Sequence, residues 1–375
     1  GTVKVNWTIG KADLSFATVD AIAPQAYTGD AVEVTPTVRL NGKIVNADQY
    51  DMTYPDGRTN AGSTKVVITA TSNGNYTGSV TTYFAINKNG ASYRLVINPE
   101  SSMYTGGEIK PSVTVYDTKG TDDDADDAVV AASNYDLTYT NNVQPGTATV
   151  IVAMKGNYEG VATGTFTITE PVAKVGDIYY ATLADAIKAV PTNGSPTVEL
   201  LKDVSEGTIA INGNRNVVLD LGGHQATSSF MYVLNGALEV KGGSLNNTVW
   251  VYGLPQNDEM KSSLMVDADA TINSDYGIVL KENISDKQSA YNASIVIDGT
   301  VNGTVWVLGN IKSGNSTINV NGGAKVVGEG VGIALNGAAS INVEDGATVT
   351  GTGSNGTGIE VRAGKLSVTG GTITG

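Results

Sequence analysis

A run of aspartates between positions 122 and 127 is the sequence feature most able to bind a metal ion. Its members are Asp122, Asp123, Asp124, Asp126 and Asp127. Clustered carboxylates suit a hard cation such as calcium, but the run lacks the glycine and the terminal glutamate of an EF-hand loop. We therefore predict a solvated acidic loop and keep calcium as the alternative. The single histidine, His224, follows two glycines at an expected turn, and the chain has no cysteine, so we expect no other cofactor.

A second acidic pair is relevant to polysaccharide cleavage. Asp267 and Asp269 lie two residues apart, so they would share one face of a strand. Hydrolases need two carboxylates at a fixed separation, whereas lyases need bound calcium and a basic residue. The arginines after position 171 are Arg215 and Arg362, which are far apart in the chain. We expect the two aspartates on a solvated face or at a corner and predict no catalytic residue.

Aromatic residues are the best candidates for ligand binding. The sequence Thr248-Val249-Trp250-Val251 recurs as Thr304-Val305-Trp306-Val307. If these valines face inward, Trp250, Tyr252 and Trp306 face outward and can stack on sugar rings. A different alignment, of Trp306 and Leu308 with Ile333 and Leu335, turns Trp306 inward. We favour this core position, because tryptophan is highly buried on average.

A repeated pattern in the C-terminal half predicts the scaffold that positions these residues. Two apolar residues flank one variable residue seven times, at intervals of 19 to 31 residues. The triplets are Leu219–Leu221, Leu238–Val240, Leu264–Val266, Ile295–Ile297, Ile318–Val320, Ile341–Val343 and Leu366–Val368. Such periods indicate the stacked turns of a solenoid. We expect the outer residues of each triplet to stack in the core and the middle residues to face solvent.

One short helix is predicted immediately before the first solenoid strand. Residues 182–190 begin at Thr182, which can cap the first turn, and Pro191 ends the segment. Their apolar stripe consists of Leu183, Ala186, Ile187 and Val190. Because the stripe needs a partner, we expect this helix to cover the N-terminal end of the solenoid core.

The N-terminal half contains a different, longer repeat. The matching segments are Tyr27-Thr28-Gly29 with Tyr104-Thr105-Gly106, Tyr50–Tyr54 with Tyr135–Tyr139, and Gly74–Gly78 with Gly156–Gly160. Short alternating strands separated by turn residues predict a small immunoglobulin-like β-sandwich for each copy. We assign module 1 to residues 10–88, module 2 to residues 89–170 and the solenoid to residues 171–375.

The first nine residues resemble the end of each module. The three similar sequences are Trp7-Thr8-Ile9, Phe84-Ala85-Ile86 and Phe166-Thr167-Ile168. We therefore expect residues 1–9 to be the last strand of a preceding repeat, and the natural chain to extend on both sides of this segment.

Composition restricts the partners of the chain. Its 23 basic and 37 acidic residues give a net charge of -14, which repels nucleic-acid phosphates and anionic lipid surfaces. Its sequence contains no apolar run of the length that a membrane span requires. We expect no nucleic-acid partner, no membrane insertion of this segment and a monomeric state.

Several motifs resemble large, adhesin-like surface proteins of Gram-positive gut bacteria. Tyr-Thr-Gly, Asn60-Ala61-Gly62 and Gly-Asn-Tyr-Xaa-Gly are similar to their immunoglobulin-like repeats. Val175–Ile187 followed by Glu199–Asp203, and Gly358–Gly364 followed by Gly370–Ile373, resemble right-handed parallel β-helix domains in similar proteins. This resemblance implies an all-β chain in which two sandwich modules precede a single-stranded parallel β-helix, the fold of pectate lyases. It also implies an extracellular protein attached to the cell wall.

Our main hypothesis is a non-catalytic cell-surface stalk or adhesin that presents a binding surface to a host or dietary glycan or to an extracellular protein. One alternative is a polysaccharide lyase or glycoside hydrolase acting through the β-helix, although a fold alone does not carry an activity. The other alternative is a dedicated glycan-binding module that uses Trp250, Tyr252 and Trp306.

Overall fold

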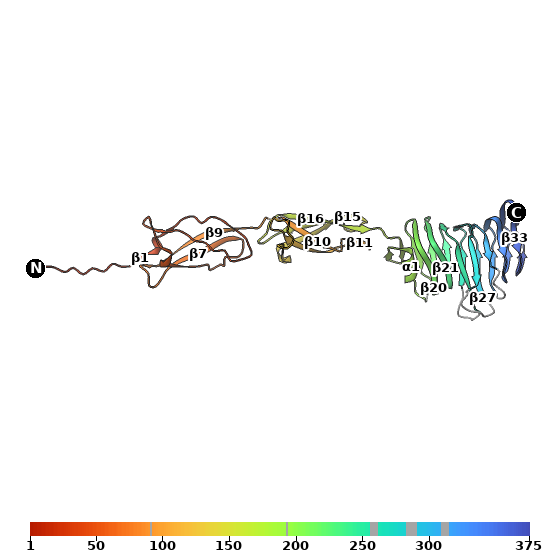
Figure 1. Ribbon diagram of the computed structural model, residues 1–375, viewed down its shortest axis with the longest axis horizontal. Helices are drawn as coiled ribbons and strands as arrows, with labels where there is room; N and C mark the ends of the chain where they lie inside the picture. The colour runs from red at the N-terminus through yellow and green to blue at the C-terminus, as the bar shows by residue number, and fades with distance from the viewer. Residues whose placement is uncertain (91, 193, 256–261, 283–290, 309–314) are drawn as a thin grey trace. The chain divides into compact units, whose positions relative to one another are not determined.

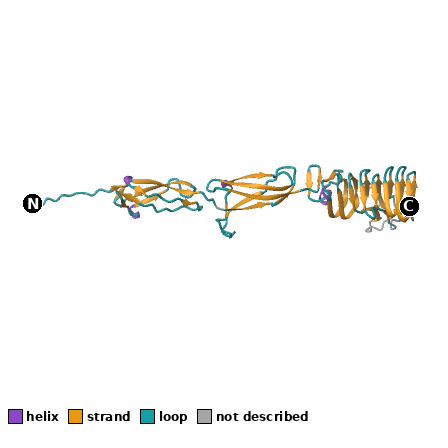
Figure 2. Cartoon of the chain, turned by 90° about the horizontal axis from the view of Figure 1, so that it is seen from above, coloured by secondary structure: helices purple, strands orange, loops and turns teal. Residues whose placement is uncertain are grey.

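The computed structural model describes residues 1–90, 92–192, 194–255, 262–282, 291–308 and 315–375 (Figure 1). The chain divides into two compact units. The first comprises Gly1–Ser102, Ile109–Asn142 and Gly146–Thr167, and the second comprises Met103–Glu108, Val143–Pro145 and Ile168–Gly375. Strands make up 56% of the chain and helices 5%, and strands dominate both units (Figure 2). The predicted all-β class is therefore confirmed.

Module 1 is a sandwich of a three-stranded sheet, in the order β2-β4-β5, and a four-stranded sheet, in the order β3-β9-β7-β6. Its strands are β1 (Ala12–Asp13), β2 (Thr18–Val19), β3 (Gln25–Ala26), β4 (Val38–Leu40), β5 (Lys43–Ile44), β6 (Tyr50–Thr53), β7 (Gly62–Ala70), β8 (Tyr76–Thr77) and β9 (Ser79–Asn87), with short 3-10 helices at Leu14–Phe16 and Ala47–Gln49. Alternation along β7 and β9 turns Val66, Ile68, Phe84 and Ile86 into the core.

Module 2 repeats this arrangement, with sheets in the orders β10-β12-β13 and β11-β16-β15-β14. Its strands are β10 (Tyr93–Asn98), β11 (Ser101–Met103), β12 (Ser112–Asp117), β13 (Ala128–Val129), β14 (Tyr135–Thr140), β15 (Gly146–Met154) and β16 (Val161–Thr169), and a 3-10 helix spans Ala132–Asn134. The buried residues Val150, Val152, Phe166 and Ile168 correspond to the core residues of β7 and β9. Two small sandwiches are therefore present, as the sequence predicted.

The C-terminal part is a right-handed parallel β-solenoid. It begins with β17 (Ala173–Val175), β18 (Ile178–Tyr180), β19 (Thr197–Leu200), β20 (Val204–Asp220), β21 (Gln225–Lys241), β22 (Ser244–Asn246), β23 (Val249–Pro255), β24 (Ser262–Val266), β25 (Thr271–Asn273) and β26 (Ile278–Glu282). It continues with β27 (Tyr291–Ile297), β28 (Thr300–Asn302), β29 (Val305–Val307), β30 (Thr317–Val320), β31 (Lys325–Leu335), β32 (Ser340–Val343), β33 (Thr348–Val361), β34 (Lys365–Val368) and β35 (Thr372–Thr374).

Parallel pairing between turns defines three outer faces. Face I contains the C-terminal parts of β20 and β21 with β24, β27, β30, β32 and β34. Face II contains the start of β21 with β22, β25, β28, the starts of β31 and β33, and β35. Face III contains the middle parts of β20 (208–212) and β21 with β23, β26, β29 and the ends of β31 and β33.

The predicted aliphatic stack runs along face I. Leu238, Leu264, Ile295, Ile318, Ile341 and Leu366 pair in register from turn to turn. They are buried except Leu366, which lies in the last turn and is 38% exposed. Leu219 and Leu221 of the first triplet are fully buried, as predicted, but it is Val217 and Leu219 that pair with Leu238 and Val240. The first rung therefore starts two residues before the predicted triplet, and Val218 takes its outward position.

Helix α1 (Leu183–Ala189) closes the N-terminal end of this core, as predicted. The Thr182 hydroxyl accepts a hydrogen bond from the Asp185 backbone N–H at 3.0 Å. Leu183, Ala186 and Ile187 are buried in the same hydrophobic cluster as the solenoid strands. The carboxylate of Glu206, in β20, accepts the backbone N–H groups of Leu183 at 2.6 Å and Ala184 at 3.0 Å. The solenoid itself thus supplies acceptors for N–H groups that the first turn of a helix leaves unpaired.

A ladder of side-chain amides runs along face II. The Nδ2 atoms of Asn246, Asn273 and Asn302 donate hydrogen bonds of 2.8 to 2.9 Å to Gln225, Asn246 and Asn273, respectively. Parallel in-register turns place identical amides one above another, so each can donate upward and accept from below. The sequence analysis did not identify this ladder.

Residues 1–9 form no strand in this chain. The apolar side chains of Val3, Val5, Trp7 and Ile9 are 73 to 86% exposed. Their expected role as the last strand of a preceding repeat stays a prediction.

Replacing Ile318 by alanine should lower the free energy of unfolding of the solenoid by about 2 to 5 kcal/mol, because its fully buried side chain lies between Ile295 and Ile341. Urea unfolding followed by circular dichroism measures this loss. The matched surface substitution Thr317→Ser on the same strand should cost much less. Equal losses would contradict the stacked core.

Asn273→Ala should lower the same free energy by about 1 to 3 kcal/mol, because it removes one donated and one accepted amide hydrogen bond. Thr271→Ala, on the same strand, is the control. The ladder would be energetically unimportant if both variants unfolded at the same urea concentration.

Candidate functional site

Face III carries tryptophans on its outer surface. Val249 and Val251 are fully buried, so Trp250 between them points outward and is only partly buried. Val305 and Val307 are also buried, and they place Trp306 in the same way. The core position that we favoured for Trp306 is therefore wrong.

The error has a simple origin in the register of one strand pair. Trp306 pairs with Ala334, and Val305 and Val307 pair with Ile333 and Leu335. The sequence alignment had placed Trp306 opposite Ile333, which is a shift of one residue. Because side chains alternate along a strand, a shift of one residue moves every side chain to the opposite face.

The outward tryptophans belong to one column of paired residues. Tyr232, Trp250, Val279 and Trp306 occupy the same position in successive turns, which are about 4.8 Å apart. Val279 also faces outward, but it is only 3% exposed between the two tryptophans. The column therefore presents a mainly apolar surface.

Four rings form a contiguous cluster on this face, and we call Phe230, Tyr232, Trp250 and Tyr252 the aromatic surface. The ring centroids of Phe230 lie 5.5 Å from Tyr232 and 6.1 Å from Trp250. Tyr252 meets Tyr232 edge-on at 6.1 Å. Trp306 lies two turns beyond Trp250. Its ring meets Tyr276 edge-on, with the ring centroids 5.9 Å apart.

Trp250, Tyr252 and Trp306 were predicted from the sequence as outward-facing candidates, whereas Phe230 and Tyr232 were not. The signal was present, because Met231 and Val233 alternate with these two rings and are fully buried. An alternation of aromatic and aliphatic residues within β21 therefore predicts that the rings face outward.

Polar groups border the aromatic surface. The Nζ atom of Lys281 lies 5.6 Å from the centroid of the Trp250 ring, a distance typical of a cation–π contact. The Nδ2 atom of Asn212 donates a hydrogen bond to the Tyr232 hydroxyl at 3.5 Å. Burial, followed by the neighbouring Tyr232, raises the pKa of Tyr252. The Tyr252 hydroxyl therefore stays protonated at neutral pH and can donate a hydrogen bond.

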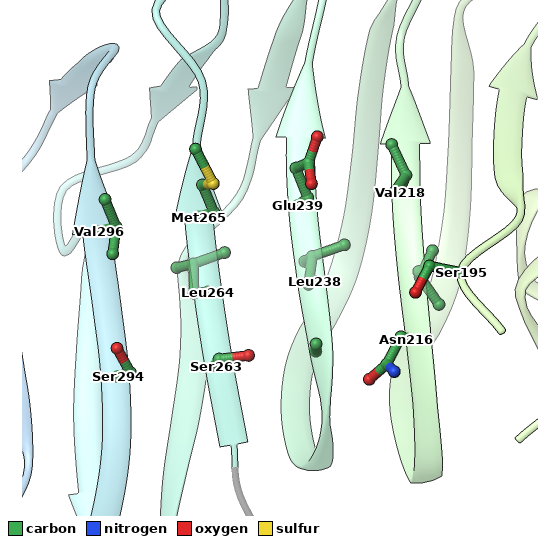
Figure 3. A pocket seen from close by; sticks show the side chains of 12 residues that line it. Ser195, Asn216, Val218, Leu238, Glu239, Ser263, Leu264, Met265, Ser294 and Val296 are labelled. Atoms are coloured by element: carbon green, nitrogen blue, oxygen red, sulfur yellow. The ribbon is translucent and has the colours of Figure 1, made fainter. Parts of the chain in front are cut away.

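Face I carries a shallow groove of about 400 Å³. Ser195, Asn216, Glu239, Ser263, Met265 and Ser294 are among its lining residues, and Figure 3 shows their side chains on adjacent strands and on the segment beside them. A second hollow of about 310 Å³ shares Ser263 and Ser294 with it. Among the described lining residues of both hollows, Glu239 is the only carboxylate.

The acidic pair Asp267 and Asp269 lies between β24 and β25. Asp269 is exposed there, as predicted, whereas the prediction of a solvated position was wrong for Asp267, which is partly buried. The Oδ1 atom of Asp269 accepts a hydrogen bond from the Gly242 backbone N–H at 3.0 Å. The Oδ1 atom of Asp267 is buried without a hydrogen-bond partner. Burial is the main cause that raises the pKa of Asp267, and the carboxylates of Glu239, Asp269 and Asp298 add to the effect.

The aspartate loop of module 2 is partly neutralised by the protein itself. The Nε atom of Arg94 donates a hydrogen bond to Oδ2 of Asp127 at 2.8 Å, and the Asp127 side chain is only 3% exposed. The Nε atom of Arg94 also lies 3.4 Å from Oδ1 of Asp124. The prediction of a solvated loop was therefore wrong for Asp127. Within the described ranges, no three acidic or histidine side chains are grouped as metal ligands.

The turn position predicted for His224 is confirmed. Its backbone N–H donates to the Leu221 carbonyl at 2.8 Å. Its Nδ1 atom lies 3.4 Å from Oδ1 of Asp203. His224 thus contributes to the hydrogen bonding of a solenoid corner.

These observations define an all-β protein with small sandwich modules and a parallel β-solenoid, whose outer faces carry an aromatic surface and a hydroxyl-lined groove. No known family model matches the chain, and a search of curated proteins also finds no match. The part of the chain that the structure describes contains no helix that is both long and apolar enough to cross a bilayer.

Asp267→Asn should stabilise the solenoid at pH 7. Because the folded-state pKa of Asp267 lies above its ordinary value of 3.8, the folded state disfavours the charged carboxylate at neutral pH. As the pH falls through the raised pKa, the Asp267 carboxylate becomes protonated and the free-energy cost of its buried charge disappears. Thermal unfolding of both proteins should therefore show a difference at pH 7 that shrinks towards pH 3.8. A constant difference across this range would contradict the assignment.

Proposed function

We propose that this chain is a non-catalytic part of an extracellular, cell-wall-attached adhesin, and that its β-solenoid binds neutral glycans through the aromatic surface. The observation that carries this proposal is the outward cluster of Phe230, Tyr232 and Trp250. Phe230 and Tyr232 lie two residues apart on β21, and Tyr232 pairs with Trp250 of the next turn. The sandwich modules would act as spacers between the cell wall and this surface.

The chemistry of the aromatic surface matches that of a sugar. One face of a pyranose ring consists mainly of C–H groups, which pack on aromatic rings, while its hydroxyls need hydrogen-bond partners at the edge. The hydroxyls of Tyr232 and Tyr252 and the ammonium group of Lys281 stand at the border of the rings. The net charge of -14 favours a neutral glycan over an acidic one.

The solenoid also holds the rings in fixed positions before a ligand binds. Met231, Val233, Val249 and Val251 are fully buried on either side of the rings and fix the strands that carry them. A preformed surface loses less conformational entropy on binding than a mobile loop does. Many copies on one cell could then convert weak single contacts into strong attachment.

The structure offers less support for polysaccharide cleavage. The groove of face I has the volume for part of a sugar chain, but a hydrolase needs two carboxylates across the bond that is cleaved. The described lining residues supply only Glu239. The aromatic surface is therefore the better-supported site.

Trp250→Ala should weaken glycan binding roughly tenfold, because it removes the ring that contacts both Phe230 and Lys281. A glycan array should first identify a neutral ligand for the unmodified protein, and titration calorimetry should then compare the variants. Trp7→Ala is the matched control, because Trp7 is 82% exposed and lies outside the solenoid.

Two results would contradict the proposal. The first is an array without any neutral ligand, and the second is an equal loss of affinity in the Trp250→Ala and Trp7→Ala proteins. New reducing ends or unsaturated products after incubation with the bound glycan would instead show an enzyme.

A further inference from the structure

A specific joint links the two sandwich modules within the first unit. The Oδ1 atom of Asn157, in the hairpin before β16, accepts a hydrogen bond from the Ala61 backbone N–H at 2.8 Å. Its Nδ2 atom donates to Oδ1 of Asn60 at 3.0 Å. The ring of Tyr158 packs edge-on against Tyr27, with centroids 5.5 Å apart. We call the contact of Asn157 and Tyr158 with Tyr27, Asn60 and Ala61 the module joint.

Both sides of this joint contain residues of the short sequence motifs, two of which are repeated in the chain. Tyr27 begins Tyr-Thr-Gly, Asn60 and Ala61 begin Asn-Ala-Gly, and Asn157 and Tyr158 belong to Gly-Asn-Tyr-Glu-Gly. The tyrosine of the second Tyr-Thr-Gly, Tyr104, lies in the second unit and packs edge-on against Tyr179 at 4.9 Å. The Tyr-Thr-Gly tyrosine therefore contacts a tyrosine from a later segment in both cases.

The segment that connects β9 to module 2 pairs with the hairpin that contains Asn157 and Tyr158. Asn89 forms a parallel bridge with Tyr158, and its backbone N–H donates to the Asn157 carbonyl at 2.9 Å. Asn89 follows Ile86, the last core residue of β9, by three positions. The end of β9 and the hairpin of module 2 are thus held at a fixed spacing.

Module 1 has the same hairpin and the same chain path at its own N-terminal end. Ala12 pairs in parallel with Tyr76, and its backbone N–H donates to the Asn75 carbonyl at 3.1 Å. Ala12 follows Ile9 by three positions, as Asn89 follows Ile86. The Asn75 side chain is exposed, whereas the equivalent Asn157 is engaged in the module joint.

The segment before Ala12 has the pattern of a sandwich strand. Val3, Val5, Trp7 and Ile9 alternate with polar residues and align with Val80, Thr82, Phe84 and Ile86 of β9. Phe84 and Ile86 are 3% and 2% exposed, whereas Trp7 and Ile9 are 82% and 86% exposed. An exposed apolar row on a segment with the alternation of a strand is the kind of surface that pairs with another sheet.

We propose that Val3–Ile9 forms the last strand of a further sandwich module of the same type, and that Asn75 and Tyr76 dock on the Asn-Ala-Gly and Tyr-Thr-Gly loops of that module. The partner is therefore a sandwich that lacks its own last strand and offers a backbone N–H and a tyrosine at its end. This inference concerns assembly and does not depend on glycan binding.

A chimeric protein tests the proposal. Residues 10–78 are duplicated and joined directly to Thr2 of the full chain, so that Thr2–Gly10 takes the place of β9 in the added copy. Trp250→Phe and Trp306→Phe leave Trp7 as the single tryptophan. We expect the emission of Trp7 to shift to shorter wavelength and the amides of residues 3–9 to exchange more slowly with deuterium.

A second chimera is the matched control. It carries the duplicated residues 10–87, which include their own last strand, so Trp7 should stay exposed. In the first chimera, Asn75→Ala in the original module 1 should destabilise the added module. Asn157→Ala should weaken the existing module joint in the same way. Exposed Trp7 in the first chimera, or equal burial in both, would overturn the proposal. Concentration-dependent burial of Trp7 in the unmodified protein would also overturn it, because it would identify a second copy as the partner.

Discussion

The register between successive turns is the constraint on which the solenoid depends. Parallel pairing repeats about every 4.8 Å, so each residue lies above the residue at the same position in the previous turn. Inside, this produces the stack of Leu238, Leu264 and Ile295. Outside, the same rule produces the amide ladder of face II and the column of Tyr232 and Trp250 on face III. Core, ladder and aromatic surface are therefore products of one geometric rule.

The sequence predicted those parts of the fold in which local pattern and packing agree. Five of the seven aliphatic triplets have a polar centre, which is the alternation expected when the outer side chains face the core. The helix after Thr182 has both a cap and an apolar stripe. The triplet Leu219–Leu221 has the predicted burial, but it is two residues out of register with Leu238–Val240, because Val217–Leu219 satisfies the same pattern. The ladder was missed because its members are separated by 21, 27 and 29 residues, and only the register shows that they meet.

Side-chain direction and long-range partners were harder to predict for the same reason. The direction of Trp306 depended on an alignment with a later turn, and one residue of error reversed it. The burial of Asp127 depended on Arg94, which lies 33 residues earlier. The Tyr-Thr-Gly and Gly-Asn-Tyr-Xaa-Gly motifs indicated a repeated module, but repetition alone does not separate core residues from residues such as Tyr27 and Asn157 that meet between modules.

Among the described residues of the solenoid, each turn pairs with the turns next to it. A duplication or deletion of one turn would therefore leave the remaining packing intact. On face III such an event would lengthen or shorten the column that contains Tyr232 and Trp250 by a single position. Gene rearrangement would in this way change the length of the outward column without changing the packing of the interior.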